Sequence, residues 1–333
     1  TPPLSFLKTY VASIIFARKL GKELGPEKMT GVLLPTSVGA ALTNVALVLM
    51  GKVPVNLNYT ASASARASAC EQCGIRHVIT SRLFLEKMPM DVPGEVIYLE
   101  DVRKRVMKSD RIAAMVLAVF CPVRVVERLL GAPRKRTPDD LATVVFSSGS
   151  EGTPKGVMLT HQNISANVEA MAEAFPFSRR DRVMGMLPIF HSFGFTVTLW
   201  LPLMRNIGVI YHPNPLEAKA VGGLIYQHRA TFFIATSTFL QAFIRRCTPE
   251  QLSSLKYVVC GAEKLAPRVH DAFREKFGIE PMEGYGATEC SPVVSVNVPD
   301  FRSPGFYQKG CKTGSIGHPI PGVAVRTIDP ESG

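Results

Sequence analysis

Short apolar runs alternate with helix-length amphipathic segments along most of this chain. The runs cover residues 32–34, 78–79, 183–187, 208–211, 231–234, 257–260 and 280–284. Such an alternation is typical of parallel, doubly wound sheets. The chain has 333 residues, which exceeds one average domain, so we expect two α/β lobes that share a large hydrophobic interior.

Turn residues support these element boundaries. Gly51 is expected to end a helix over residues 38–50, and Pro267 to open another after the loop 261–265. Thr160 is placed to cap a helix over residues 161–174.

Two uncharged stretches, residues 29–51 and 183–204, are long enough to cross a bilayer. The first is interrupted by Pro35 and the second by Pro188 and Pro202, which favours a strand, a polar turn and a buried helix in each. No signal-peptide pattern occurs at the start of the printed sequence. We therefore expect a cytoplasmic protein.

The formal net charge of +11 indicates an anionic partner, such as nucleotide phosphates, a lipid surface or an acidic carrier protein. Nucleic acid is excluded, because the sequence has no RNA-binding aromatic signature, zinc finger or helix-turn-helix pattern. The seven cysteines are an odd set, and only Cys70 and Cys73 have a metal-like spacing. Since nothing completes a tetrahedral site, we interpret them as reduced thiols.

The segment 103–136 departs from the alternation, because it pairs an apolar stretch, residues 112–120, with basic flanks. The flanking cations are Arg103, Lys104, Arg105, Lys108, Arg111, Arg134, Lys135 and Arg136. Two interpretations remain open. One is an interfacial helix on anionic lipid, and the other is an ordinary amphipathic helix docked on its domain.

A loop rich in Gly, Ser and Thr, residues 146–156, follows a strand predicted over residues 141–145. Its backbone N–H groups and hydroxyls can surround phosphate oxygens, and Lys155 supplies a cation. It is not a Walker A loop, since that order of residues is absent and Pro154 would spoil the helix start. A surface turn is the alternative.

A second cluster, residues 284–289, follows the strand 280–284, where doubly wound folds place ligands. Tyr285 offers an aromatic face for a purine, Thr288 a hydroxyl for a phosphate, and Glu289 a carboxylate for Mg²⁺. Alone, this cluster is weak, because a Tyr and a Glu that flank a glycine turn more often reflect packing and solvent exposure.

Together the two clusters resemble motifs of the acyl-adenylate-forming superfamily, the AMP-dependent synthetases and ligases. This superfamily includes acyl-CoA synthetases, peptide-synthetase adenylation domains and luciferases. Three further segments match in family order: residues 187–194, 261–265 and 314–319. The resemblance extends over nearly the whole chain.

The resemblance implies a role for each matching residue. The triphosphate would be lined by Ser147, Ser148, Gly149, Ser150, Glu151, Gly152, Thr153 and Lys155. Around adenine it places Gly261, Ala262, Glu263, Tyr285 and Gly286. Thr288 would touch the α-phosphate, Glu289 would hold Mg²⁺, and His191 would lie between the acyl pocket and the nucleotide. Lys155, His191, Thr288 and Glu289 are thus the expected catalytic residues, although His191 is also placed to cap a helix.

The resemblance also implies a fold: the large N-terminal part of an adenylate-forming enzyme, with two doubly wound, mainly parallel sheets and helices between and outside them. Residues 1–182 would form the first lobe, 183–320 the second, and 321–333 the start of a connection. Relatives continue with a Thr-Gly-Asp motif, a hinge and a lid domain bearing a lysine. We therefore expect a fragment that lacks the lid and adenylates poorly by itself.

Within the superfamily, residues 147–152 and 290–300 most resemble the acyl-[acyl-carrier-protein] synthetase part of bifunctional bacterial enzymes. Those enzymes also have 2-acylglycerophosphoethanolamine acyltransferase activity. The resemblance implies ATP-dependent and Mg²⁺-dependent activation of a fatty acid to acyl-AMP. Transfer to the thiol of acyl-carrier protein would then serve lysophospholipid reacylation at the inner face of the plasma membrane. The alternatives are a long-chain acyl-CoA synthetase, with CoA as acceptor, and a non-catalytic nucleotide-binding or membrane-docking module.

Overall fold

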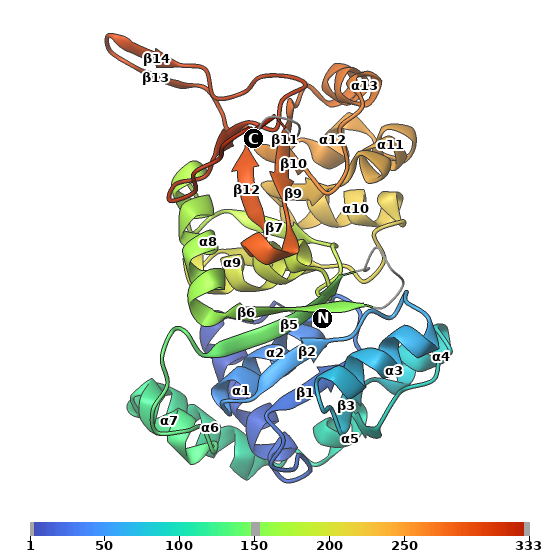
Figure 1. Ribbon diagram of the computed structural model, residues 1–333, viewed down its shortest axis with the longest axis vertical. Coiled ribbons are helices and arrows are strands. Elements are labelled where there is room, and N and C mark those ends of the chain that lie inside the picture. The colour runs from blue at the N-terminus through green and yellow to red at the C-terminus, as the bar shows by residue number, and fades with distance from the viewer. Residues whose placement is uncertain (1–2, 148–153, 330–333) are drawn as a thin grey trace. The chain divides into compact units, whose positions relative to one another are not determined.

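A computed structural model describes residues 3–147 and 154–329 of the chain (Figure 1). The chain divides into two compact units. Unit 1 contains Thr1–Asn163 and Pro188–Phe195, and unit 2 contains Ile164–Leu187 and Thr196–Gly333. This division differs from the two lobes expected from the sequence, because residues 164–182 belong to unit 2 and residues 188–195 to unit 1.

Unit 1 is built on a four-stranded parallel sheet in the order β2-β1-β3-β4. Its strands are β1 (Met29–Val32), β2 (Val53–Asn56), β3 (His77–Thr80) and β4 (Glu95–Tyr98). The helices between them are α2 (Val38–Leu49), α3 (Ala63–Gln72) and α4 (Arg82–Lys87). Each of these helices follows a serine whose hydroxyl accepts a backbone N–H of the first turn, so the strand-to-helix turns are fixed locally.

The remaining helices of unit 1 are the first helix, α1, and three later helices in the described part of the same unit. They are α1 (Phe6–Leu20), α5 (Leu99–Lys104), α6 (Lys108–Phe120) and α7 (Val123–Leu129). Buried side chains of α1, α6 and α7, among them Ile14, Ala114 and Val126, form one apolar cluster. The inner face of the segment 103–136 is therefore docked on its own unit, as one of the two interpretations of the sequence predicts.

A separate antiparallel hairpin, β5 (Leu141–Ser147) and β6 (Lys155–Thr160), lies against β2. The buried hydroxyl of Thr143 donates to the carbonyl oxygen of Pro54 at 2.8 Å. Both strands extend into the segment that we predicted as a loop, since Phe146 pairs with Gly156 and Ser147 with Lys155. The predicted loop 146–156 is wrong at both ends, because ladder hydrogen bonds continue there.

Unit 2 contains a seven-stranded sheet in the order β15-β12-β11-β10-β9-β7-β8. Its strands are β7 (Arg182–Gly185), β8 (Gly208–Tyr211), β9 (Phe232–Ala235), β10 (Tyr257–Cys260), β11 (Pro281–Gly286), β12 (Val293–Val296) and β15 (His318–Pro319). The strands from β8 to β11 are parallel, whereas β12 and β15 run antiparallel to their neighbours. The sheet is therefore mixed at one side.

Helices cover both faces of this sheet. They are α8 (His161–Ala174), the π-helix η1 (Gly194–Trp200), α9 (Leu201–Arg205), α10 (Ala218–His228), α11 (Ser237–Arg246), α12 (Pro249–Leu252) and α13 (Pro267–Phe277). Figure 1 shows α10 to α13 grouped on one side of the strands of unit 2 and α8 on the other. Phe233, Phe243 and Phe273 are fully buried between strand and helices, and each buried phenylalanine stabilises the fold by about 1.5–3 kcal/mol.

A small hairpin, β13 (Phe301–Ser303) and β14 (Phe306–Gln308), projects from unit 2 in Figure 1. In residues 3–147 and 154–329, no helix combines the length and the apolar character needed to cross a bilayer. The uncharged stretch 29–51 instead forms β1 and α2, and 183–204 forms most of β7 followed by η1 and most of α9.

The predicted α/β class is confirmed, and several elements coincide with their predicted bounds, among them β8, β10 and α8. Thr160 caps α8 as predicted, because its hydroxyl accepts the backbone N–H of Asn163 at 3.1 Å. The strand predicted over residues 280–284 runs two residues further, to Gly286, since β12 pairs with it there.

Candidate functional site

The carboxyl ends of β10 and β11 lie side by side in unit 2. The two strands are parallel, with Cys260 opposite Glu283, so the segments that follow them emerge at the same edge of the sheet. One segment is the predicted motif 261–265, and the other is the predicted motif 284–289. The structure therefore brings two motifs together that lie about twenty residues apart in the sequence.

The loop after β10 is held by its glutamate. The Glu263 carboxylate accepts the backbone N–H of Thr238 at 3.2 Å and its hydroxyl at 2.8 Å. Thr238 lies in the first turn of α11, where unpaired N–H groups and the helix dipole favour a carboxylate. Ala262 has a positive φ of 66°, so the loop turns sharply here.

The segment after β11 is the turn of a hairpin with β12, and not the start of a crossover helix. The pairing register shifts between Tyr285 and Gly286, and a short 3₁₀-helix, η2 (Thr288–Cys290), follows. Tyr285 is 51% exposed, Glu289 is exposed, and Thr288 is half-buried. The turn thus presents an aromatic ring and a carboxylate to solvent at the edge of the sheet.

Gly286 is required by close packing within this turn. A Cβ atom at this position would lie 2.3 Å from the carbonyl oxygen of Pro292. The Cβ atom would be fixed to the backbone of β11 and the oxygen belongs to the backbone leading into β12, so neither could move without distorting the hairpin.

Two buried polar side chains hold the same turn from beneath, and sequence reasoning missed both. Asn167 of α8 donates its amide to the carbonyl oxygens of Val293 at 2.8 Å and Cys290 at 3.2 Å. It also accepts the N–H of Val293 at 3.3 Å. Thr196 of η1 donates its hydroxyl to the carbonyl oxygen of Ser291 at 2.9 Å. The only sequence signal for Asn167 is an amide within the apolar face of an amphipathic helix.

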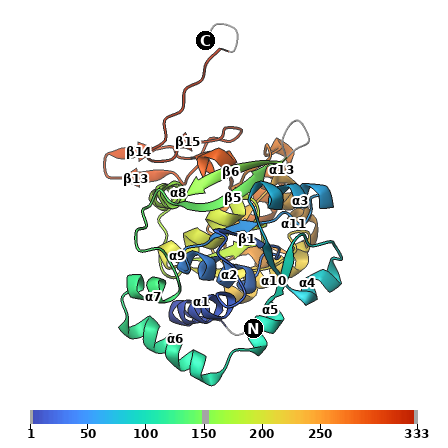
Figure 2. The same cartoon turned by 60° about the horizontal axis from the view of Figure 1, so that its bottom comes forward.

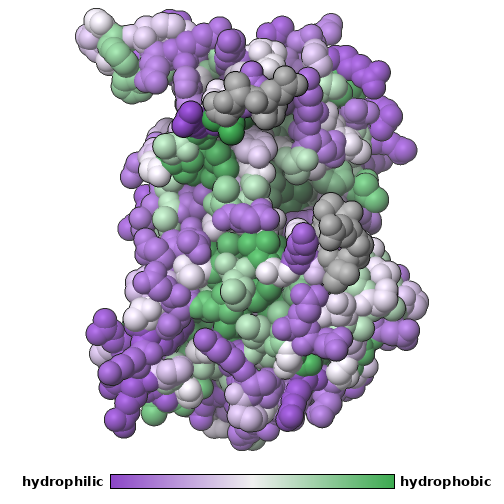
Figure 3. All heavy atoms as spheres, viewed as in Figure 1, coloured by the Kyte–Doolittle hydropathy of each residue, from purple (hydrophilic) through white to green (hydrophobic). Residues whose placement is uncertain are grey.

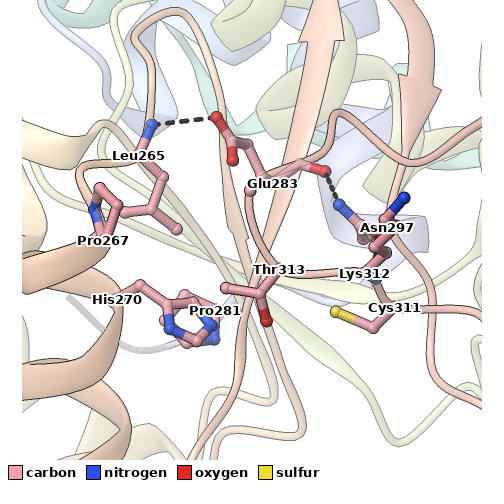
Figure 4. A pocket seen from close by; sticks show the side chains of 10 residues that line it. Leu265, Pro267, His270, Pro281, Glu283, Asn297, Cys311, Lys312 and Thr313 are labelled. Carbon is pink, nitrogen blue, oxygen red and sulfur yellow. Dashed lines mark hydrogen bonds between the residues drawn. The ribbon is translucent and has the colours of Figure 1, made fainter.

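A third predicted motif, residues 314–319, contacts Asn297, which Figure 4 shows beside Glu283. The buried Asn297 amide donates to the carbonyl oxygens of Glu283 at 2.9 Å and Ser315 at 2.6 Å. Gly317 has a φ of 79°, and a Cβ atom there would lie 2.1 Å from the backbone nitrogen of Asn297. Asn297 therefore joins the motif 314–319 to Glu283, the residue directly before the motif 284–289.

Figure 4 shows a small hollow beside these contacts. It is lined by Leu265, Pro267, His270, Pro281, Glu283, Asn297, Cys311, Lys312, Thr313 and Gly314. The Glu283 carboxylate, which accepts the N–H of Leu265 at 3.0 Å, ties the motif 261–265 to β11. Because Tyr285, Thr288 and Glu289 do not line the hollow, it is not the predicted nucleotide site.

Cys260, at the end of β10, is a buried thiol at the base of this site. Burial raises the pKa of the Cys260 thiol to about 12, and the carboxylates of Glu283 and Glu263 add to the effect. A neutral thiol is a poor nucleophile, so Cys260 contributes packing and no covalent chemistry.

The other predicted phosphate ligands belong to unit 1. Lys155 is exposed at the start of β6, opposite Ser147, whose hydroxyl donates to the carbonyl oxygen of Lys155 at 3.5 Å. Gln72 of α3 donates to the carbonyl oxygen of Pro154 at 3.1 Å. The remaining predicted ligands, Ser148, Gly149, Ser150, Glu151, Gly152 and Thr153, lie outside the described residues.

His191 also belongs to unit 1, where it is exposed and its ring lies 4.6 Å from that of Phe190. Its carbonyl oxygen accepts the N–H of Phe195 at 2.8 Å, as expected at the entry to a helix. The role of His191 beside a nucleotide stays a prediction, as does the convergence of the motifs of both units on one ATP.

Comparisons with known proteins identify related chains. The sequence pattern of the family described as AMP-binding enzyme matches residues 4–333. The long-chain-fatty-acid–CoA ligase of Bacillus subtilis (strain 168) is 31% identical over 251 residues, which are 72% of this chain and 42% of that protein. The medium-chain fatty-acid–CoA ligase of Escherichia coli (strain K12) is 30% identical over 198 residues, 58% of this chain and 34% of that one. The chain thus spans less than half of either relative.

Solved structures share the fold. Apo MatB from Rhodopseudomonas palustris superposes with a TM-score of 0.74 at 21% identity, over 97% of this chain and 61% of that one. O-succinylbenzoate coenzyme A synthetase (MenE) from Bacillus subtilis, in complex with AMP, gives a TM-score of 0.73 at 21% identity, over 94% and 74%. The predicted fold is therefore confirmed by solved structures as well as by the described strands and helices.

Proposed function

Because the chain belongs to the AMP-binding enzyme family, we propose that it is the nucleotide-binding part of an enzyme that activates a fatty-acid carboxylate with ATP. The β11–β12 turn carries this proposal. It presents Tyr285 and Glu289 at the carboxyl edge of a mainly parallel sheet, where such folds bind nucleotides, and Asn167 and Thr196 fix its backbone. The names of two relatives, both fatty-acid–CoA ligases, support the acyl substrate.

The proposed chemistry gives the acyl group a better leaving group. A carboxylate is a poor acylating agent because its leaving group would be oxide. In the first step a carboxylate oxygen attacks the α-phosphorus of ATP, and the bond from that phosphorus to pyrophosphate breaks. In the second step a thiolate attacks the acyl carbon, and AMP leaves with the electron pair of the mixed anhydride. The protein contributes mainly positioning and charge neutralisation.

Each motif receives a role in this proposal. Tyr285 stacks on adenine beside the loop Gly261 to Glu263, and the Thr288 hydroxyl contacts the α-phosphate. Lys155 and the hydroxyl of Ser147 contact the triphosphate from the β5–β6 hairpin. His191 separates the acyl pocket from the nucleotide. These assignments rest on the resemblance and on the exposure of Tyr285, Lys155 and His191.

The residues present fit a magnesium ion. Glu289 is exposed, and no ion pair found in the described part of the chain includes it. Among the described residues there is no group of three or more His, Cys, Asp or Glu side chains that could hold a metal. A single carboxylate that acts together with substrate phosphates is a usual arrangement for Mg²⁺, which would neutralise charge on the departing pyrophosphate.

For the acceptor thiol we propose acyl-carrier protein, with CoA as the alternative. The excess of cations favours an acidic carrier protein, whereas the names of the relatives favour CoA. Transfer from the carrier protein to lysophospholipid would place the enzyme at the inner face of the plasma membrane. Turnover of the full-length enzyme with CoA and with holo acyl-carrier protein, at equal concentrations, decides between the two.

Calorimetry with Mg-ATP and fatty-acid-dependent ATP–pyrophosphate exchange, both on the full-length enzyme, test the activation step. We expect binding and exchange in the wild type. A Tyr285→Ala variant should bind Mg-ATP about 10-fold or more weakly, because an aromatic face that stacks on a base is worth about 1–3 kcal/mol. Absence of both binding and exchange in the wild type would favour the non-catalytic module.

A further inference from the structure

The helices α6 and α7 are docked on unit 1 by only one side. Ala114 of α6 and Val126 of α7 are fully buried in the cluster with α1. Asp110 is also buried on this side, where its carboxylate pairs with Lys19 of α1 at 2.6 Å. These contacts fix which face of the two helices points away from the unit.

That outer face is apolar. Ile112 is 67% exposed, Phe120 78% and Leu129 65%. Further exposed apolar side chains on the two helices are Met115, Val116, Val119, Val123 and Val125. Ile112, Met115, Val116 and Val119 have the i, i+3, i+4, i+7 spacing of one helical face. A surface helix normally turns polar residues outward, so an exposed apolar row of this kind indicates an interaction surface.

Unneutralised cations surround the apolar row. Those that are exposed and take part in no ion pair within the described residues are Arg103, Lys104, Lys108, Arg111, Arg124, Arg128, Arg134 and Lys135. The acidic residues of the segment 103–136 are both occupied, since Asp110 pairs with Lys19 and Glu127 with Arg136. The surface therefore combines apolar side chains with a net positive charge.

The figures show where this surface lies on unit 1. In Figure 2, α6 runs along the outside of α1, and α7 follows it at the same margin. In Figure 3, hydrophilic residues gather at the lower left, where Figure 1 labels α6 and α7. We call the exposed side of the two helices and their flanking residues the α6–α7 face (residues 103–136).

We propose that the α6–α7 face binds the surface of an anionic lipid bilayer. Charge complementarity selects this partner: the cations meet lipid phosphates while the aliphatic side chains and Phe120 enter the boundary between headgroups and acyl chains. Nucleic acid would use the cations but leave the apolar row in water. This proposal rests on the membrane location given under the proposed function, and it assigns that location to one surface of unit 1. Vesicle binding is measured without acyl activation, so the two proposals are tested separately.

Flotation of the full chain with lipid vesicles tests the proposal. We expect binding to vesicles of phosphatidylcholine mixed with phosphatidylglycerol, weakening as salt rises, and little binding to phosphatidylcholine alone. The double variant Lys108→Gln with Arg111→Gln should lower the partition coefficient about 30-fold, because each cation near the surface contributes about 1 kcal/mol. The variant Ile112→Ser with Val119→Ser should lower it about 10-fold or more, at similar helix propensity.

Matched controls separate this face from general charge and hydrophobicity. Arg179→Gln with Arg180→Gln removes two exposed cations in unit 2, and Leu83→Ser removes an exposed apolar side chain on α4. Both controls should bind anionic vesicles within about twofold of wild type, because neither site touches the proposed surface.

Equal binding of wild type to both kinds of vesicle, or no binding to either, would overturn the proposal without any variant. So would full binding by both α6 variants, or selective capture of acyl-carrier protein by this face in place of vesicles. ATP–pyrophosphate exchange measured without lipid reports separately on the proposed activity.

Discussion

The described residues of the two motifs that carry the resemblance each belong to or follow a strand of a β-hairpin, but the two hairpins are held in the protein differently. The β11–β12 turn continues the seven-stranded sheet of unit 2 and is held by buried side chains from α8 and η1. The β5–β6 hairpin forms its own two-stranded sheet in unit 1, and a side-chain hydrogen bond from Thr143 joins it to β2. One motif thus follows a strand of the seven-stranded sheet, whereas the described ends of the other, Ser147 and Lys155, pair in a separate two-stranded sheet whose strand β5 is buried against unit 1.

This difference indicates how the backbone of the β11–β12 turn is held in place. A turn that presents an aromatic ring and a carboxylate must hold both at defined positions, and buried hydrogen bonds do this well because breaking them leaves unpaired groups. The β5–β6 hairpin is held mainly by apolar packing, since Val144 of β5 is buried in one cluster with Val55 of β2. We therefore expect the buried hydrogen bonds of Asn167 and Thr196 to fix the position of the β11–β12 turn.

The largest expected effect comes from one charge on each hairpin. Glu289→Gln and Lys155→Gln should each lower ATP–pyrophosphate exchange about 100-fold or more, since the first removes the proposed carboxylate for Mg²⁺ and the second removes the proposed cation for the triphosphate. Both side chains are exposed, so melting temperatures should stay near wild type.

The double variant Glu289→Gln with Lys155→Gln tests whether the two hairpins act on the same bound ATP. If both charges act on one bound ATP, the combined loss is smaller than the product of the single losses. Lys219→Gln and Glu275→Gln, exposed elsewhere in unit 2, serve as controls that should keep wild-type exchange. Wild-type rates in Glu289→Gln would remove that residue from the proposed site.

Gly286→Ala should lower the free energy of unfolding by about 3 kcal/mol, because the new methyl group would meet the backbone of Pro292. Gly223→Ala in α10 is the matched control, since a Cβ atom there has no neighbour within 4 Å and alanine favours the helix. Urea denaturation measures both. Equal stability of the two variants would mean that the turn is not closely packed.

Asn167→Ala should lower the free energy of unfolding by about 2 kcal/mol, because buried groups of the turn lose their partner. It should also weaken Mg-ATP binding, since the turn that carries Tyr285 is no longer fixed. Asn167→Asp keeps one acceptor but brings a carboxylate against two carbonyl oxygens, so it should be no better than alanine. Rescue of binding by aspartate would contradict this account.

Thr143→Val should have the smallest effect, about 1 kcal/mol in the free energy of unfolding, because it removes the hydrogen bond from β5 to Pro54 and adds no cavity. Denaturation under the conditions used for Asn167→Ala gives the comparison directly. If Thr143→Val cost more than Asn167→Ala, the β5–β6 hairpin would be the more strongly held of the two.

The periodicity of the sequence predicts the parallel core of unit 2 well. The segments of β8 and β10 read as short apolar runs, and Pro267 marks the start of α13. These signals are local, so a single sequence carries them. The antiparallel strands were not predicted, because β12 and β15 are short and their pairing depends on partners distant in the chain.

The candidate site was predicted in part. Tyr285 and Glu289 stand out because their types suit a nucleotide and a metal ion. Asn167 gave no such signal, because its function is to bond the backbone of residues more than 120 positions away, and only the folded chain brings them within 3.3 Å. Supporting contacts of this kind depend on tertiary packing, which periodicity does not encode.

The short strand β15 has a consequence for association between molecules. It forms one margin of the seven-stranded sheet, has only two residues, and ends in Pro319, which has no N–H to donate. A terminal strand this brief offers little template for an added chain, so this side of the sheet resists self-assembly into longer sheets. The fold thereby keeps a strongly apolar sheet from growing by edge-to-edge pairing at the side where the candidate site lies.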